Sequence, residues 1–480
     1  MTPSETSPGP RPPGPEGNPV VGQWRFLRDP LGYLERAHRD HGDLVRLPLV
    51  GSPVAAFGPD EVDAVNEGLG EQVEIDGGGG VDLPPRHTVQ GRGVLNSTGA
   101  EHALYRRICH RALGGRSLAS YSTIAAQETE RLLATWSPGD HLDLLPVMTG
   151  LTRRIFKRYM FGADPAVRSP AADAAVDLYI DILESTPRRL ATTFLPVEVP
   201  GLAQRRKLRV ALAAIDAEVE AIADGRVRPA DHSLARALLD ELDREEVPRD
   251  PGLVRDFMLQ LHFAGLTSLA SAVVWALLLL SLHPGPARTL LDELATAVEG
   301  RVPLPSDVRS LPYLEAVLDE TMRLYPAAAW EVKRAVGPVE VGGQRLPAGV
   351  ALMLAPWVTQ RSGESFPEPL EFRPERFLGG PGGYPSAAFQ PWGIGERSCI
   401  GKQLARNAFR SIVGGVAQRF RLDLEPDQRI DPDPGLLGNR VLPKPGVRVV
   451  LAAQDGVTER SAARVLGSVV GAVPGPEVGP

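Results

Sequence analysis

The chain has 480 residues, of which 43% are hydrophobic and 23% charged, and these values are typical of a globular protein with a large core. A formal net charge of −7 gives no indication of a nucleic-acid partner. Two cysteines, Cys109 and Cys399, exclude a disulfide framework and fit a reducing cytoplasm. A lone cysteine in an unusual context is then a candidate nucleophile or metal ligand.

The N-terminal part begins with a proline-rich stretch, residues 1–20, that has no apolar run. It predicts a flexible lead-in rather than a signal peptide or membrane anchor. Helical spacing from Trp24 to Gly42 is followed by two short β-type runs and by a further helix from Asp60. The segment 75–95 contains four consecutive glycines and predicts a loop, which either covers a pocket or is plain surface.

Between residues 99 and 330 the pattern is overwhelmingly helical. The longest predicted helix begins near Gly252 and ends at His283. No Asp, Glu, Lys or Arg occurs from Phe257 to Ala287, so a membrane-spanning helix is an alternative. The run contains polar residues, has no second span beside it and shows no clear Lys/Arg bias at its flanks. A helix that is buried on all sides inside a large helical core is therefore favoured over a membrane span.

The C-terminal part predicts a hairpin with a glycine turn at residues 339–354. After an irregular, proline-rich stretch, a helix with one apolar face runs from about Ile400 to Phe420. A last strand precedes a loose tail at residues 456–480. The pattern predicts one folded domain over residues 21–455.

Cys399 lies after a glycine-containing loop and directly before a predicted helix. Helix N-termini stabilise anions, which predicts a lowered thiol pKa. Gly393 and Gly395 let the backbone approach a flat ligand, and Arg397 can pair with an acidic group on it. A phosphate loop fits poorly, because five residues separate its glycines and Gln403 replaces the Ser/Thr. A nucleophilic cysteine with a histidine base and a plain buried cysteine remain alternatives.

The stretch from Phe389 to Gly401 resembles the cysteine-ligand loop of the cytochrome P450 family. The family pattern is an aromatic residue followed by Gly-x-Gly-x-Arg-x-Cys-x-Gly. The matching residues are Gly393, Gly395, Arg397, Cys399 and Gly401. The resemblance implies haem b with Cys399 as the iron ligand, and with Trp392, Gly393 and Arg397 in its binding site. Trp392 replaces the usual Phe, and its indole N–H needs a partner.

Glu320 and Arg323 lie three residues apart on one face of a predicted helix. By themselves they indicate no more than an exposed ion pair, which contributes little to stability. The resemblance implies a buried triad with Arg376 that braces the cysteine loop against the helical core.

Basic residues at two places match the family's haem-propionate sites. His102 and Arg106 are spaced to share one helix face, although such a pair is usually solvated. Either Lys333 or Arg334 corresponds to the basic residue for the other propionate, and the sequence does not choose between them. The resemblance extends over roughly residues 15–453.

The central helix departs from the family, which has Ala-Gly-x-acid-Thr-Thr where this chain has Ala264 to Leu269. Thr267 replaces the acid and Ser268 the alcohol that together deliver protons during oxygen activation. Ser268 can relay protons with water, Thr267 or a substrate hydroxyl, because a hydroxyl both donates and accepts. Alternatively, oxygen activation is impaired, and the protein uses peroxide, catalyses another haem reaction or only binds a ligand.

The resemblance implies a mainly α fold with a small β region: a triangular prism with haem between the long central helix and the cysteine loop. It implies a monooxygenase that uses O2. The expected pocket wall consists of Leu266, Thr267, Ala328, Trp330 and Val332. Leu266 favours an apolar substrate such as a terpenoid, fatty acid or polyketide of secondary metabolism.

No flavin or nicotinamide domain is recognisable, so electrons are expected from a separate ferredoxin and its reductase. A cytoplasmic monomer is expected. The expected docking patch consists of Arg107, Arg111, Lys402, Arg406 and Arg410, with scattered solvated arginines as the alternative.

Overall fold

The computed structural model describes residues 11–68, 73–75, 92–95, 97–162, 174–178, 202–226, 232–379, 383–434, 440–456 and 465–469. Most of segment 75–95 and of the tail at 456–480 lies outside these ranges, so the two expectations for them stay predictions. A helix begins at Pro19, inside the stretch expected to be a flexible lead-in.

Helices make up most of the described chain. They are α1 (Pro19–Arg28), α2 (Pro30–His41), α3 (Pro59–Glu67), α4 (Gly99–Ala112), α5 (Gly115–Leu133), α6 (Leu144–Phe161), α9 (Leu202–Ala223), α10 (Leu234–Arg244), α11 (Pro251–Leu282), α12 (Pro284–Val298), α13 (Pro312–Leu324), α14 (Pro356–Thr359) and α15 (Lys402–Arg419). Several begin with proline at the first helical position, where its missing N–H costs no hydrogen bond.

The strands form small sheets. They are β1 (Leu44–Arg46), β2 (Val54–Ala56), β3 (Val73–Ile75), β4 (His141–Asp143), β5 (Glu331–Ala335), β6 (Val339–Val341), β7 (Gln344–Leu346), β8 (Ala351–Leu354), β9 (Phe420–Leu424), β10 (Asp431–Asp433), β11 (Leu442–Lys444) and β12 (Arg448–Ala453). The largest sheet has the order β1-β2-β8-β5-β3, and a second has the order β4-β12-β9. The predicted hairpin is confirmed for β6 and β7, whereas β8 leaves it to pair with β2 and β5.

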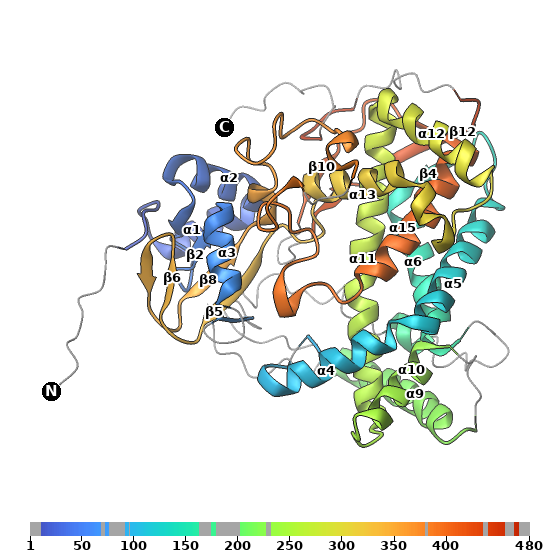
Figure 1. Cartoon of the computed structure of the whole chain (residues 1–480), viewed down its shortest axis with the longest axis horizontal. Helices are drawn as coiled ribbons and strands as arrows, with labels where there is room; N and C mark the ends of the chain where they lie inside the picture. Colours follow the sequence, from blue (N-terminus) through green and yellow to red (C-terminus); the bar gives the residue numbers. More distant parts are fainter. Residues whose placement is uncertain are drawn as a thin grey trace.

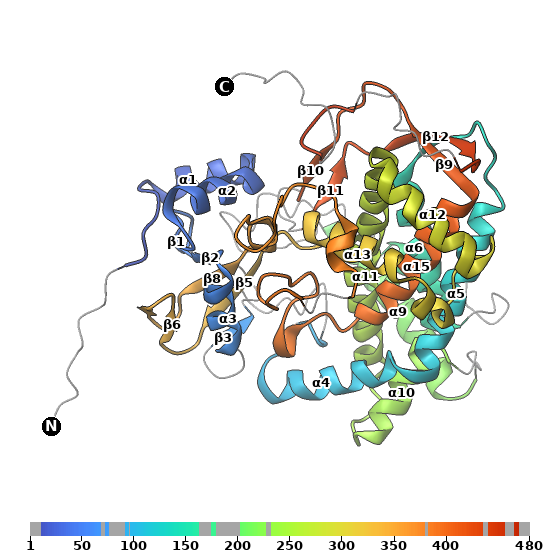
Figure 2. The same cartoon turned by 45° about the horizontal axis from the view of Figure 1, so that its top comes forward.

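The long helix α11 runs through the helical part, with α6 and α15 beside it (Figure 1). Figure 2 shows the same arrangement from a second direction, with the large sheet and α1 to α3 at the opposite end of the molecule. Trp275 of α11 is fully buried, stacks on Tyr325 at 3.8 Å between ring centroids and donates a hydrogen bond to the carbonyl of Val441.

Among the described helices, α11 alone is long and apolar enough to cross a membrane. Neighbouring elements bury 72% of its most apolar window, which has a mean hydropathy of 2.1. An apolar helix that other parts of the same chain bury to this extent is typical of a large helical core. The contacts therefore favour the core helix over the membrane span.

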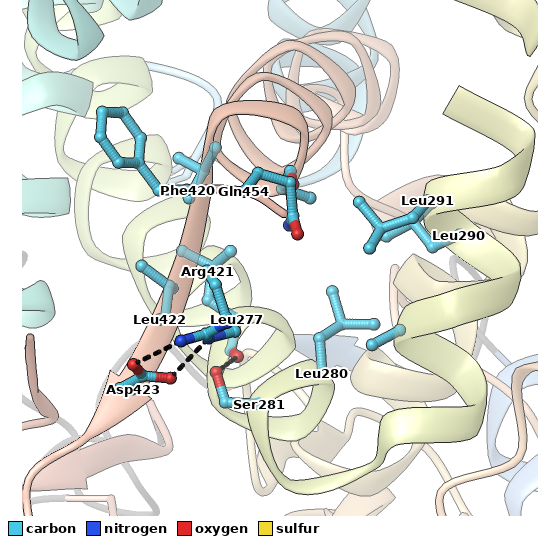
Figure 3. Close-up of a pocket in the computed structure, with 13 residues that line it drawn as sticks. Leu277, Leu280, Ser281, Leu290, Leu291, Phe420, Arg421, Leu422, Asp423 and Gln454 are labelled. Atoms are coloured by element: carbon cyan, nitrogen blue, oxygen red, sulfur yellow. Dashed lines mark hydrogen bonds and ion pairs between the residues drawn. The ribbon is translucent and has the colours of Figure 1, made fainter. Parts of the chain in front are cut away.

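A small apolar groove lies where the end of α11 meets α12, α15 and β9 (Figure 3). Its volume is about 70 Å³, and Arg421 closes one side through an ion pair with Asp423 at 3.0 Å. Ligand pockets are usually several hundred Å³. The groove is therefore too small to hold an organic substrate.

Candidate active site

A cavity of about 470 Å³ lies between α11, α4 and the loop before α15. Residues that line it include Ala264, Gly265 and Ser268 of α11, Ala327 and Ala328 after α13, and Cys399. A cavity of this size, mainly apolar with a few polar groups, is typical of a small-molecule site. It shares no lining residue with the groove of Figure 3.

The cysteine loop folds back on itself and presents Cys399 to this cavity. The N–H of Cys399 donates to the carbonyl of Trp392 at 2.6 Å, which closes the loop. Gly393 and Gly395 have φ values of +67° and +70°, a left-handed conformation that favours glycine. These two positions explain why the motif has glycine there.

Two opposing effects act on the pKa of the Cys399 thiol. Desolvation by the surrounding walls is the larger effect and raises the pKa, although the side chain keeps accessible surface where it lines the cavity. The N–H of Gly401 and the charges of Arg106 and Lys402 lower this pKa, as expected for a cysteine before a helix. The expected net lowering is therefore not seen.

The three residues of the expected triad lie together in the interior. Arg323 donates through Nε to Glu320 at 2.6 Å, and Arg376 donates through Nε to the same carboxylate at 3.0 Å. Arg323 and Glu320 have no exposed surface. The pair is therefore not the exposed ion pair that was the alternative.

Gln360 connects this triad to the cysteine loop. Its Nε2 donates to the carbonyls of Met322 and Arg323 at 3.0 and 3.2 Å, and its Oε1 accepts from the N–H of Gln390 at 2.9 Å. Gln360 is fully buried. No sequence pattern points to Gln360, because it follows a four-residue helix that is too short to show periodicity.

Three basic side chains meet on one wall of the cavity. Arg106 donates to the carbonyl of Ser398 at 3.0 Å, and Arg397 donates to the carbonyl of Ser97 at 2.7 Å. Burial and then the charges of Arg397 and Arg106 lower the pKa of His102 to about 4. The two arginine charges on one wall favour an anion beside them, so this wall fits the carboxylates of a haem.

Lys333 and Arg334 are not among the residues that line the cavity, so the expectation that one of them binds a haem carboxylate stays a prediction. Lys333 is buried and donates to Asn66 at 2.7 Å, and its Nζ lies 3.3 Å from the carboxylate of Glu331. Arg334 donates to the carbonyl of Gly349 at 3.1 Å. Glu331 does line the cavity, and alternation along β5 places Lys333 on the same strand face as Glu331.

The two hydroxyl residues of α11 have different partners. Ser268 lines the cavity and donates to the carbonyl of Ala264 at 2.6 Å. Thr267 accepts a hydrogen bond from Arg440, which also donates to the carbonyl of Phe263 at 3.1 Å. Arg440 lines the cavity but was missed, since 173 residues separate it from Thr267.

The expected pocket wall is only partly correct. Ala328 lines the cavity, whereas Leu266, Thr267, Trp330 and Val332 do not. Leu266 is buried, and its carbonyl accepts from Thr152 of α6, because Leu266 lies on a different helix face from Ala264, Gly265 and Ser268. Trp330 packs against Phe26 of α1 at 5.3 Å between ring centroids.

The expected docking patch is also only partly correct. Arg406 pairs with Glu315 at 2.8 Å and Asp319 at 2.9 Å, and the buried Arg410 pairs with Glu315 at 2.7 Å. These arginines bind acids of α13, against which α15 packs. Lys402 is exposed, and on α4 Arg107 and Arg111 are half exposed, although both pair with Glu245.

His262 of α11 is fully buried against Phe156, at 5.0 Å between ring centroids. Neither ring nitrogen has a hydrogen-bond partner in the described part of the chain. Burial and then the charges of Arg153 and Lys157 lower the pKa of His262 to about 3. The neutral imidazole is therefore the form that the fold accepts.

We expect His262→Leu to reduce the loss of stability in acid. In the unfolded chain the pKa is about 6.5, so at pH 5 the unfolded state binds more protons than the folded state. Stability is lost as pH falls below 6.5, and His262 should contribute about 2 kcal/mol of loss between pH 7 and pH 5. Urea unfolding at both pH values measures this difference. The exposed His110→Leu is the control, and an equal acid loss in wild type and His262→Leu would contradict the prediction.

Comparisons with known proteins agree with the family resemblance of the cysteine loop. The family model described as Cytochrome P450 matches residues 12–450. Cyclooctat-9-en-7-ol 5-monooxygenase of Streptomyces melanosporofaciens is 30% identical over 436 residues, which cover 88% of this chain and 93% of that protein. Pentalenene oxygenase of Streptomyces avermitilis is 26% identical over 427 residues, which cover 87% and 92%. The mainly α fold with small sheets is the expected one, and the chain belongs to the cytochrome P450 family of monooxygenases.

Proposed function

We propose that this P450 inserts one atom of O2 into an apolar terpenoid of secondary metabolism, with haem b bound through Cys399. The observation that carries the proposal is the position of Cys399 on a mainly apolar cavity of about 470 Å³ under α11. The names of two relatives, a cyclooctat-9-en-7-ol 5-monooxygenase and a pentalenene oxygenase, support a terpenoid over a fatty acid or polyketide.

Haem with a thiolate ligand supplies the oxygen activation, because the sulfur donates electron density to the iron. His102, Arg106 and Arg397 would bind the carboxylates of the haem on the basic wall of the cavity. Lys333 would remain paired with Glu331. The triad and Gln360 would keep the cysteine loop in place through their hydrogen bonds.

Thr267 and Ser268 offer two different groups for proton transfer. Ser268 donates its hydrogen to Ala264, so its oxygen is left to accept from a water. Thr267 accepts from Arg440, so its own hydrogen can be donated. The guanidinium next to the Thr267 oxygen polarises the hydroxyl and makes it a better donor. This arrangement supports monooxygenation without a carboxylate at position 267.

Ser268→Ala should lower the rate of product formation by roughly 10²-fold, at the lower end of what a proton-transfer group contributes. NADPH consumption should fall less, with the difference recovered as hydrogen peroxide. Product, NADPH and peroxide are measured in the same reaction. Ser281→Ala is the matched control, because Ser281 donates to a carbonyl of α11 at its far end. Equal product from wild type and Ser268→Ala would contradict the role of Ser268.

The proposal is tested by spectroscopy and turnover of the haem-loaded protein. Reduced protein with carbon monoxide should show the strongly red-shifted Soret band of a thiolate ligand. A surrogate ferredoxin and reductase with NADPH should then yield oxygenated product from a terpenoid. The thiolate band without turnover would favour a ligand-binding haem protein, for which the lack of an acid at position 267 is the supporting observation. Turnover with peroxide but not with NADPH would favour the peroxide-dependent alternative.

Electrons would come from a separate ferredoxin and reductase in the cytoplasm. A groove of about 300 Å³ runs along α4 and reaches Glu396 of the cysteine loop. Arg107, His110 and Arg111 are exposed along this groove and make it the proposed docking surface. Arg406 and Arg410 of α15 are too buried to take part. A basic surface next to the cysteine loop suits an acidic electron donor.

A further inference from the structure

Arg440 lines the cavity from a different element than the basic wall does. It lies shortly before β11, whereas His102 and Arg106 belong to α4, and β11 and α4 lie at different levels along α11 (Figure 2). The carbonyl of the next residue, Val441, accepts hydrogen bonds from two side chains of α11 at 2.6 and 2.9 Å. These bonds to α11 fix the backbone that carries Arg440 beside the cavity.

The guanidinium of Arg440 is held by three contacts with α11. It donates to the hydroxyl of Thr267 and to the carbonyl of Phe263 at 3.1 Å, and its central carbon lies 4.5 Å from the centroid of the Phe263 ring. Ser268 donates to the carbonyl four residues before it, whereas at Thr267 the corresponding carbonyl, that of Phe263, accepts from Arg440. A charged group that is fixed in this way loses little further side-chain entropy when it binds a ligand.

The surroundings of Arg440 strengthen its attraction for an anion. Its two acceptors on α11 are neutral, and a guanidinium has five N–H groups, more than these two bonds require. The cavity is mainly apolar, and an electrostatic attraction is stronger in an apolar medium than in water. Two parallel N–H groups of a guanidinium match the two oxygens of a carboxylate.

The other charged residues of the cavity face partners of a different kind. Arg106 and Arg397 belong to the wall that fits the two carboxylates of the haem. Glu331 is the acid among the described residues that line the cavity, and its carboxylate lies 3.3 Å from Nζ of Lys333. Arg440 is therefore the cation placed to face a substrate rather than the haem.

We propose that Arg440 binds a carboxylate of the substrate, so that the enzyme oxygenates terpenoid acids in preference to terpenoid hydrocarbons. This inference rests on the proposed function and names the class of terpenoid that it acts on. The carboxylate takes no part in the reaction; its bond to Arg440 fixes which carbon of the apolar skeleton faces the haem. A terpenoid hydrocarbon has no carboxylate, so an earlier oxidation of one of its carbons must supply this substrate.

The experiment measures how tightly the haem-loaded protein binds matched terpenoid acids and esters, from the spin-state shift of the haem. Geranic, farnesoic and abietic acids are each compared with their methyl esters, which keep the apolar skeleton and lose the charge. Wild type should bind at least one of these acids about tenfold more tightly than its ester, as expected for a charge-assisted hydrogen bond in place of a neutral one. Binding is the readout because Arg440 also holds Thr267, so its replacement would disturb turnover as well.

Two variants of Arg440 separate its charge from its shape. Arg440→Met should remove the preference for the acid, and Arg440→Lys should restore part of it, because an ammonium keeps the charge without the paired N–H groups. Arg429→Met is the matched control, since it removes the same charge from an exposed residue that pairs with Asp431 at 2.6 Å and does not line the cavity. It should retain the preference of the wild type.

Equal affinity of the wild type for every acid and its ester would overturn the inference, as would a preference for the acid that Arg440→Met retains. Either result leaves the proposed function intact when the protein shows the thiolate band and oxygenates a neutral terpenoid. A haem-loaded wild type that oxygenates no terpenoid, whether acid or neutral, would overturn the proposed function and this inference together.

Discussion

Replacing Cys399 with alanine should abolish both the thiolate-type carbon monoxide band and product formation supported by NADPH. The N–H of residue 399 would still donate to the carbonyl of Trp392, so the loop should keep its shape. Only the sulfur is lost, and with it the electron donation that favours O–O cleavage. Haem retained by the variant should be weakly bound and should show no thiolate signature. Absorbance of the reduced protein with carbon monoxide and the ratio of haem to protein measure these losses.

The other cysteine provides the control. Cys109 of α4 is fully buried, and burial raises the pKa of its thiol to about 12, so it is a poor thiolate donor. Cys109→Ala should keep the band and the turnover of the wild type. A thiolate band in Cys399→Ala would overturn the assignment of the ligand.

Glu320→Ala should destabilise the fold by about 3–5 kcal/mol, the cost of removing one partner from a buried ion pair. The variant leaves Arg323, which has no exposed surface, without its carboxylate, and Arg376 loses the same partner. Remaining bonds from Arg323 to the carbonyls of Gln360 and Pro369 do not neutralise its charge. Because Gln360 also holds the N–H of Gln390, the damage should reach the cysteine loop.

Urea unfolding and the fraction of haem with the thiolate band measure the two effects. Asp240→Ala is the matched control, since it breaks an exposed ion pair with Arg236 at 2.9 Å on α10. Exposed pairs of this kind contribute at most about 1 kcal/mol. Equal losses in the two variants would mean that Glu320 does not act as a buried partner.

Several features of the site could be read from the sequence because they are local. The cysteine loop is a contiguous motif whose glycines require positive φ, and the positions of Glu320 and Arg323 follow from helical spacing. The long apolar run predicted α11, since a run of that length without charges requires burial. The replacement of the family's usual acid by Thr267 was also visible in the sequence, because it lies within a contiguous motif.

The sequence by itself determined the family, the cysteine loop, the long helix α11 and the indole in place of phenylalanine. Only the tertiary structure decided which residues meet across the chain: Arg440 with Thr267, Gln360 with the N–H of Gln390, and Lys333 with Asn66. It also decided that Leu266 faces away from the cavity, that the arginines of α15 are paired, and that desolvation raises the pKa of Cys399. The physical reason is that periodicity and spacing act over a few residues, whereas desolvation and ion pairing depend on whichever distant element packs alongside.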